Sequence, residues 1–140
     1  MTNILIAEDN PVNRELLREM LEIWGYDVSE AGNGREALES IARRRPDVLL
    51  LDLDMPVLDG FETIRQIRAN PQSATLPVLA VTAYAMQGDR EKILANGFDD
   101  YTSKPIDFAS LGRQIQQLLR TRDCQTAGNP GHAGAAGSGQ

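Results

Sequence analysis

Short apolar runs alternate with longer amphipathic segments along this chain, and this alternation limits the folds that it can adopt. Each of five short runs has the length of a strand and is followed by a segment whose apolar residues recur at helical spacing. Such alternation is typical of parallel βαβ units. The expected strands span residues 3–7, 27–31, 47–51, 76–81 and 99–102, and the expected helices span residues 11–24, 34–45, 61–69, 86–95 and 107–120.

The most economical topology for five such units is an α/β fold of the flavodoxin-like kind. Right-handed crossovers give a (βα)5 doubly wound parallel sheet of five strands in the order 2-1-3-4-5. A chain of 140 residues is long enough for one such domain. Residues 1–122 are expected to form it. Residues 123–140 are rich in Gly and Ala without a large apolar side chain, so we expect a disordered tail.

Composition excludes several classes of protein. A net charge of -6 disfavours nucleic acid and anionic membranes as partners. No apolar run approaches the roughly 18 residues that span a bilayer, and no signal-peptide pattern precedes the first strand. The single cysteine, Cys124, cannot form an internal disulfide, so the cytoplasm is the expected compartment. The single histidine, His132, lies in the Gly/Ala tail, which argues against Ser-His-Asp triads and histidine-ligated zinc.

Polar side chains follow four of the expected strands at the point where each strand ends. Glu8 and Asp9 follow the first strand, Asp52 follows the third, Thr82 the fourth and Lys104 the fifth. In an open parallel sheet, the carboxyl ends of the strands meet at one edge, near the switch point between strands 1 and 3. The topology therefore brings three acids, a hydroxyl and an ammonium to one place.

This convergence favours a metal-dependent reaction at Asp52. Three carboxylates within about 4 to 5 Å of one another repel by about 3 to 4 kcal/mol per pair at an effective dielectric near 20, and Lys104 offsets only part of that. All-oxygen ligands with open positions suit Mg2+. A carboxylate beside Mg2+ is a competent nucleophile for phosphorus and gives an aspartyl phosphate. Lys104 would neutralise charge on the transferred group, and Thr82 would donate a hydrogen bond.

With these residues placed, the chain resembles the response-regulator receiver domain, the CheY-like family of two-component and phosphorelay signalling. The resemblance covers residues 3–119. It rests on four motifs in order, namely the acidic pair of AEDN, the D-x-x-M-P that begins at Asp52, the Thr of VTAYA and the Lys-Pro of SKP. It implies a phosphorylation-activated switch rather than an enzyme. The only reactions that it implies are self-phosphorylation from a phosphodonor and slow self-dephosphorylation.

The resemblance also implies how Mg2+ is held and where the phosphoryl group goes. Asp52 matches the phosphoacceptor. Glu8 and Asp9 match the acids that hold Mg2+, with Asp9 and Asp52 as direct ligands. The backbone carbonyl of Asp54 is implied as a further ligand. Asp59, which precedes Gly60, is expected only to form a turn or cap a helix.

Further positions match residues that respond to phosphorylation in this family. Thr82 resembles the hydroxyl residue that follows the phosphoryl group inward, and Tyr101 lies at the aromatic position that swings inward with it. Lys104 resembles the lysine that pairs with the phosphate, and the Lys104-Pro105 bond is expected to be cis. Asp54 and Tyr84 flank the line along which water would attack, so they are expected to tune the lifetime of the phosphoryl group.

The same resemblance implies partners. A histidine kinase or histidine phosphotransfer protein would donate the phosphoryl group, and a downstream protein would read the face formed by helix 4, strand 5 and helix 5. That face is also where we expect a weak dimer, if the protein is not a monomer. The segment 86–95 contains Gly88 and few apolar residues, so it should be easy to shift. The motifs are closest to single-domain regulators such as DivK, and a receiver excised from a hybrid histidine kinase is the alternative.

Two unrelated functions share parts of the pattern. LLLDLD mimics the D-x-D motif of haloacid-dehalogenase-type phosphatases, which also use Mg2+. That motif normally closes the first strand, however, and the phosphatase lysine precedes the second acidic pair, whereas Asp99 and Asp100 precede Lys104 here. A flavodoxin-type FMN binder would carry Ser, Thr and Gly in its first loop, and AEDNPVN would repel the phosphate instead. A degenerate receiver that only binds partners is disfavoured by the complete set of acids, Thr82 and Lys104.

Overall fold

The computed structural model describes residues 2–53, 58–83 and 87–127, which form an alternating series of strands and helices. All neighbouring strands are parallel, and their order is β2-β1-β3-β4-β5, as predicted. The strands are β1 (Asn3–Ala7), β2 (Asp27–Ala31), β3 (Val48–Asp52), β4 (Val78–Thr82) and β5 (Asp100–Ser103). The helices are α1 (Pro11–Ile23), α2 (Gly34–Arg43), α3 (Gly60–Ala69), α4 (Gln87–Ala95) and α5 (Phe108–Ala127).

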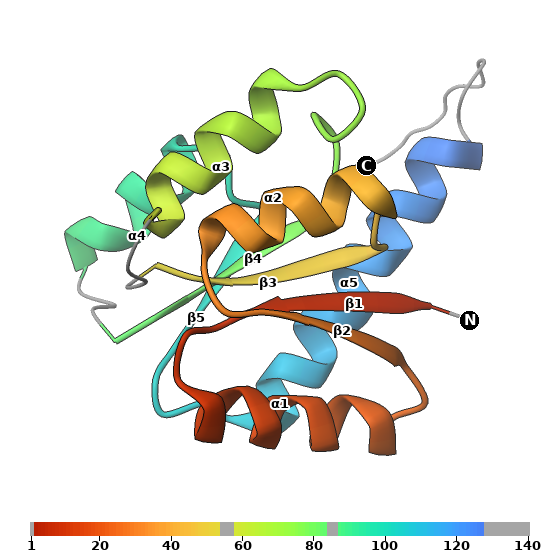
Figure 1. Cartoon of the computed structure of the whole chain (residues 1–140), viewed down its shortest axis with the longest axis vertical. Helices are drawn as coiled ribbons and strands as arrows, with labels where there is room; N and C mark the ends of the chain where they lie inside the picture. Colours follow the sequence, from red (N-terminus) through yellow and green to blue (C-terminus); the bar gives the residue numbers. More distant parts are fainter. Residues whose placement is uncertain (1, 54–57, 84–86, 128–140) are drawn as a thin grey trace.

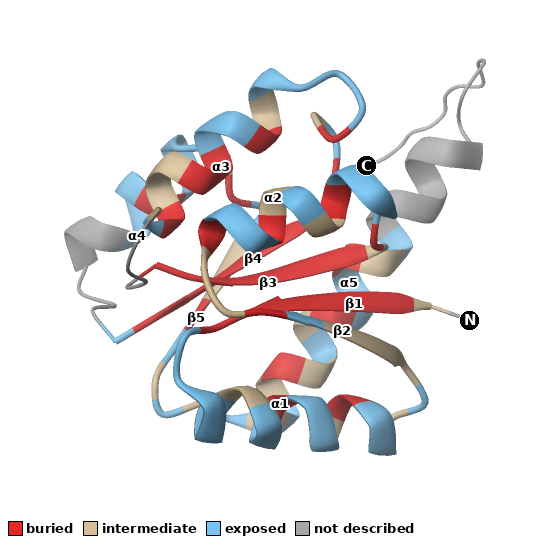
Figure 2. Cartoon of the chain, in the orientation of Figure 1, coloured by how far each residue is buried: buried red, intermediate tan, exposed pale blue. Residues whose placement is uncertain are grey.

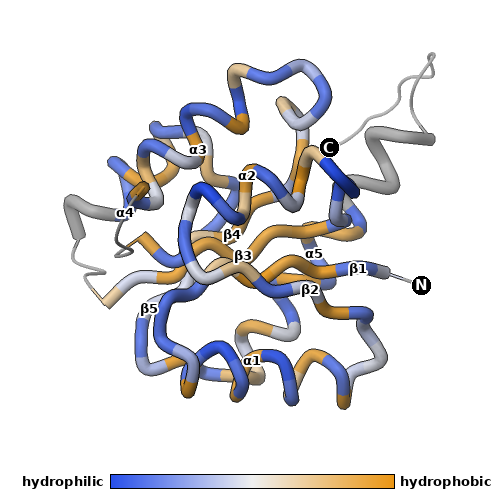
Figure 3. The backbone as a smooth tube through the Cα atoms, viewed as in Figure 1, coloured by the Kyte–Doolittle hydropathy of each residue, from blue (hydrophilic) through white to orange (hydrophobic). Residues whose placement is uncertain are grey.

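The helices cover both faces of the sheet. In Figure 1, α1 and α5 lie on one face, whereas α2, α3 and α4 lie on the other. The three central strands are buried along their whole length, because each is covered from both sides (Figure 2). The hydropathy of the backbone follows the same division, with apolar strands inside and polar outer helix faces (Figure 3). Among the described residues, no helix is long and apolar enough to cross a membrane.

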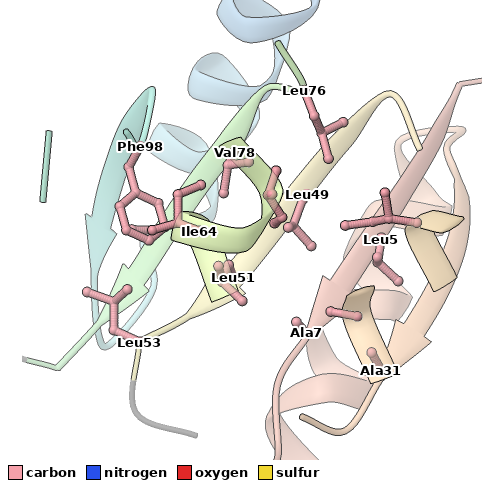
Figure 4. Packing of buried hydrophobic residues seen from close by; sticks show 14 of the residues in the cluster. Leu5, Ala7, Ala31, Leu49, Leu51, Leu53, Ile64, Leu76, Val78 and Phe98 are labelled. Atoms are coloured by element: carbon pink, nitrogen blue, oxygen red, sulfur yellow. The ribbon is translucent and has the colours of Figure 1, made fainter. Parts of the chain in front are cut away.

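Each face of the sheet has its own apolar core. The larger core joins β1, β3 and β4 to α2, α3 and α4, and Figure 4 shows Leu49, Leu51 and Val78 of the sheet facing Ile64 of α3. The other core joins the opposite face of the sheet to α1 and α5 through residues such as Leu17 and Ile115. Packing on both faces fixes the sheet, and the sheet in turn fixes the loops at its carboxyl edge.

The register of the strands aligns their carboxyl ends. Ala7 of β1 pairs with Leu51 of β3, so that the residues after Ala7 lie beside Asp52. Asp52 pairs with Val81 of β4, and Thr82 pairs with Ser103 of β5. This is the edge at which the sequence predicts the acids, the hydroxyl and the ammonium to converge.

Side chains at the N-termini of α1 and α3 cap these two helices. Asn10 accepts hydrogen bonds from the amides of Val12 and Asn13, and Asp59 accepts one from Glu62. The capping role of Asp59 agrees with the sequence analysis.

Only part of the apolar stripe of α1 is buried. Leu17 and Leu21 are buried, whereas Val12 and Leu16 are 71% and 49% exposed. A helix that packs on one face of a sheet buries only the residues along its line of contact, and the apolar stripe of α1 is wider than that line. The two exposed side chains lie on the turns of α1 that follow the Asn10 cap.

Most predicted boundaries differ from the observed ones by one or two residues, but α5 is longer than predicted. Its helical backbone continues to Ala127, beyond the predicted end at residue 120. The prediction ended the helix where its apolar stripe ends, although no Gly or Pro interrupts the chain between Arg120 and Ala127.

Gly60 allows the start of α3 to lie against the end of β3. A Cβ atom on Gly60 would lie 2.7 Å from Leu53 Cα and 3.0 Å from the carbonyl oxygen of Asp52. Gly60→Ala should therefore lower the free energy of unfolding by roughly 1 to 3 kcal/mol, because backbone atoms must move to accept the methyl group. Urea denaturation measures this change.

Gly112→Ala in α5 is the matched control. Its Cβ would lie 3.4 Å from the nearest atom of Trp24, which is ordinary contact. We expect the stability of this variant to be unchanged or raised by up to about 1 kcal/mol through helix propensity. Equal effects of the two substitutions would contradict the steric role of Gly60.

Candidate functional site

The carboxyl edge of the sheet brings the predicted polar residues together. Glu8 directly follows β1, Asp52 and Thr82 are the last residues of β3 and β4, and Lys104 directly follows β5. Four segments far apart in the sequence therefore meet at the switch point of the sheet, where open α/β folds bind their ligands.

Lys104 is paired with both of the buried acids. Its Nζ lies 3.1 Å from Oδ2 of Asp52 and 3.4 Å from Oε1 of Glu8. The Lys104 amide donates to the carbonyl oxygen of Thr82 at 2.8 Å, which holds the loop after β5 against the end of β4. The Lys104-Pro105 peptide bond is cis. The ammonium therefore lies over the carboxylates rather than in solvent.

The three acids form a compact oxygen cluster. One carboxylate oxygen each from Glu8, Asp9 and Asp52 lies within 4.8 Å of the others. Glu8 and Asp52 are each only 2% exposed, whereas Asp9 is exposed. The cluster thus has two buried members and one that faces solvent, which leaves open positions for a ligand.

Burial sets the protonation of Glu8. Desolvation, with the neighbouring Asp52 charge adding to it, raises the pKa of Glu8 from 4.5 to about 7, against the opposing effects of the Asn10 amide and Lys104. Desolvation opposes the charge of Lys104, but its hydrogen bond to Asp52 and the charges of both acids outweigh this effect and raise its pKa. The site therefore retains a protonated lysine and an excess of carboxylate.

The residues present fit a Mg2+ ion. The donor atoms are all oxygens, which this hard cation prefers, and one or two carboxylates with open positions are its usual protein ligands. One ammonium cannot balance three carboxylates, so a divalent cation would remove the remaining repulsion. Asp9 and Asp52 are the expected direct ligands, with Glu8 behind them.

Two hydrogen bonds fix the loop that carries the acidic pair. The Asn10 amide donates to Oε2 of Glu8 at 3.1 Å, and Nη1 of Arg14 donates to the carbonyl oxygen of Glu8 at 2.8 Å. The sequence analysis did not single out Arg14. Its position in the sequence could have identified it. Arg14 lies one turn inside the helix that Asn10 caps, and a long side chain at such a position points back toward the start of the helix.

Of the remaining predicted positions, the structure describes Tyr101. Tyr101 is half-buried on β5 and packs against the larger core, and its carbonyl oxygen accepts a hydrogen bond from Gln114 of α5 at 2.8 Å. Asp54, with its backbone carbonyl, and Tyr84 lie outside the described residues.

The raised pKa of Glu8 predicts a pH-dependent stability of the metal-free protein. Between about pH 4.5 and 7 the folded state binds more protons than the unfolded state, so stability should fall as the pH rises through this range. The expected loss is on the order of 1 to 3 kcal/mol, measured by urea denaturation in EDTA at several pH values.

Glu8→Gln should flatten this profile, because it removes the titrating group. Glu19→Gln, a change of an exposed glutamate on α1, is the control and should retain the slope. A wild-type profile equal to that of Glu8→Gln would contradict the assignment.

Comparisons with known proteins agree with this geometry. The family model of the response regulator receiver domain matches residues 4–116. The response regulator DivK of Brucella anthropi is 39% identical over 117 residues, which cover 84% of this chain and 95% of DivK. A hybrid signal transduction histidine kinase of Dictyostelium discoideum is 37% identical over 130 residues, which cover 87% of this chain but only 7% of the kinase.

A solved structure supports the same conclusion. The receiver domain of the Pseudomonas aeruginosa sensor histidine kinase PA1611, crystallised with a magnesium ion in its active-site cleft, is 42% identical to this chain. The two structures superpose with a TM-score of 0.79 over 85% of this chain and 98% of that domain. With the fold, the acidic cluster and these relatives in agreement, the chain belongs to the response regulator receiver domain family.

Proposed function

We propose that this protein is a phosphorylation-activated switch that accepts a phosphoryl group on Asp52 with the help of Mg2+. The observation that carries the proposal is the buried Asp52 carboxylate, hydrogen-bonded to Lys104 at 3.1 Å within a cluster of three acids. The phosphodonor would be a histidine kinase or a histidine phosphotransfer protein in the cytoplasm, and the recipient of the signal a downstream protein.

The chemistry follows from the positions of the side chains. An oxygen of Asp52 forms a bond to phosphorus while the bond from phosphorus to the imidazole nitrogen of the donor breaks, and the electron pair returns to that nitrogen. When bound, Mg2+ supplies positive charge to the phosphoryl oxygens. Lys104 is hydrogen-bonded to Asp52 and would neutralise part of the negative charge on the phosphoryl oxygens. The hydroxyl group of Thr82 would donate a hydrogen bond to one of these oxygens.

The surface beside Asp52 supports access by a protein donor. A groove of about 440 Å³ lies between α1 and the loop after β5, and Glu8, Leu16, Lys104 and Phe108 are among the residues that line it. Leu16 and the neighbouring Val12 are exposed apolar side chains on α1. A helix of the phosphodonor could bury them while it presents its histidine to Asp52.

The route of the signal is proposed to run through β4 and β5 to the face formed by α4, β5 and α5. Thr82 ends β4 and pairs with Ser103, two residues beyond Tyr101. Of the α4 side chains that the structure describes, only Ile93 is buried. Such a weakly packed helix can respond to small changes at Thr82 and Tyr101.

Other features of the switch remain predictions. Asp54 and Tyr84 are proposed to tune the lifetime of the phosphoryl group, and the α4-β5-α5 face is proposed as the contact of a weak dimer, if the protein is not a monomer. DivK and the hybrid-kinase receiver are both relatives, so a free-standing regulator and a receiver within a larger kinase are both consistent with the proposal.

Phosphorylation by a small donor tests the assignment of Asp52. Incubation with acetyl phosphate and Mg2+ should add the mass of one phosphoryl group in a base-labile bond, because a buried carboxylate beside the metal is the nucleophile. Mass spectrometry should show no adduct for Asp52→Asn, and EDTA should abolish it in the wild type.

Asp59→Asn is the matched control, since Asp59 follows the same strand but caps α3. Asparagine also caps helices, so the fold should persist and the adduct should form as in the wild type. No adduct in the wild type, or an adduct that persists in Asp52→Asn, would contradict Asp52 as the phosphoacceptor.

The switch itself is tested with a phosphoryl mimic. Addition of beryllofluoride and Mg2+ should shift the NMR signals of Thr82, Tyr101 and α4, because new charge at Asp52 changes the packing that these elements share. The signals of α2, which packs over β1 and β2 on the β2 side of the sheet, should change least, and Asp52→Asn should show no shifts. Unchanged signals at Thr82, Tyr101 and α4 would contradict the proposed route.

A further inference from the structure

Arg14 links the loop of the acidic pair to the edge strand β2. Its Nη1 donates to the carbonyl oxygen of Glu8 at 2.8 Å, and its Nε lies 3.0 Å from Oε1 of Glu30. The side chain of Arg14 is 24% exposed, and that of Glu30 is 29% exposed. Because the planar guanidinium is held at two nitrogens, its orientation is fixed.

The hydrogen bond to Glu8 holds the peptide unit that precedes Asp9. The Glu8 carboxylate has further partners, namely Lys104 and the Asn10 amide. In the part of the chain that the structure describes, the Asp9 carboxylate has no hydrogen-bond partner, although its oxygen lies within the acidic cluster. The position of Asp9 therefore depends on its backbone, and the Arg14 guanidinium holds the carbonyl group directly before Asp9.

We propose that Arg14 is a positioning residue for the cation site, which it serves by holding the Glu8–Asp9 peptide where Asp9 can reach the metal. This inference rests on the Mg2+ site proposed above. Arg14 itself is a cation and cannot be a ligand, so it acts only through the loop. Groups that orient metal ligands commonly affect metal affinity, although they do not touch the ion.

The two possible roles of Arg14 predict opposite changes in Mg2+ affinity when its side chain is removed. If Arg14 contributed only its charge, its removal would strengthen Mg2+ binding, because one positive charge near the site would be lost. If Arg14 positions Asp9, its removal should weaken Mg2+ binding despite this gain. The direction of the change in affinity therefore separates the two roles.

Arg18 provides a matched control on the same helix. It also pairs with Glu30, at 2.7 Å, and with Glu22 at 3.2 Å, and its contacts do not include the loop of the acidic pair. Arg14→Gln and Arg18→Gln thus remove the same charge and a bond to the same glutamate. Only Arg14→Gln removes the hydrogen bond to the Glu8 carbonyl oxygen.

Isothermal titration of the full chain with MgCl2 at fixed ionic strength measures the affinity. Arg14→Gln should raise the Kd by about three- to tenfold through the loss of a charge-assisted hydrogen bond. Arg18→Gln should leave the Kd within about twofold of the wild type or lower it slightly, since it removes only screened charge. Arg14→Lys, which retains the charge without the two-nitrogen geometry, should give an intermediate Kd.

Hydrogen exchange of the metal-free proteins provides a readout that does not involve the ion. The amides of Glu8 and Asn10 donate hydrogen bonds to Ala31 and to the Glu8 carboxylate. They should exchange about threefold faster or more in Arg14→Gln than in the wild type, because the loop is released. The same amides should be unaffected in Arg18→Gln. Circular dichroism at the titration temperature verifies that all variants are folded.

The outcomes separate this inference from the proposed function. A wild-type protein that binds no Mg2+ would overturn the metal site itself. A wild-type protein that binds Mg2+, with an unchanged or lowered Kd in Arg14→Gln, would overturn only the positioning role of Arg14. Equal weakening by Arg14→Gln and Arg18→Gln would also overturn it, because the effect would then arise from Glu30 rather than from the loop.

Discussion

The ion pair between Lys104 and the two buried acids is the interaction on which the rest of the site depends. Glu8 and Asp52 are each 2% exposed, and Lys104 lies within 3.4 Å of an oxygen of both. Buried carboxylates are costly without a partner, and one ammonium compensates only one of them. Burial raises the pKa of Glu8 to about 7, which shows how strongly the site favours the uptake of positive charge. A proton on Glu8 or a divalent cation can supply that charge.

The sheet and its two apolar cores hold the acids and Lys104 in place. The strands that end at Ala7, Asp52 and Thr82 are central and buried on both faces, so their ends cannot separate without opening both cores. The loops are fixed by local contacts, namely the Asn10 cap, the close approach at Gly60 and the bond from the Lys104 amide to Thr82. The rigid sheet positions the acids, whereas α4 is packed less tightly, with Ile93 as its buried side chain among those described.

The sequence predicts most of this because parallel strands impose simple rules. Apolar runs of strand length identify the sheet, and the residue after each run lies at its carboxyl edge, so Glu8, Asp52, Thr82 and Lys104 could be placed together without a structure. Contacts that depend on side-chain reach could not be predicted in this way, and the bond from Arg14 to Glu8 is the main example. The sequence analysis also missed the exposure of Val12 and Leu16, because tertiary packing decides which side of α1 is buried. It missed the end of α5 at Ala127 because helix propensity extends the helix beyond the residues that pack on the core.

The central claim is that this acidic cluster is a divalent cation site with Asp52 at its centre. Crystals grown with Mn2+ in place of Mg2+ test it most directly, through the anomalous signal of the bound ion. The account predicts one strong peak in the cluster, in contact with oxygens of both Asp9 and Asp52, and its disappearance in Asp52→Ala. A saturating concentration of Mn2+ that gives no peak between these carboxylates, or a peak elsewhere on the protein only, would contradict the account.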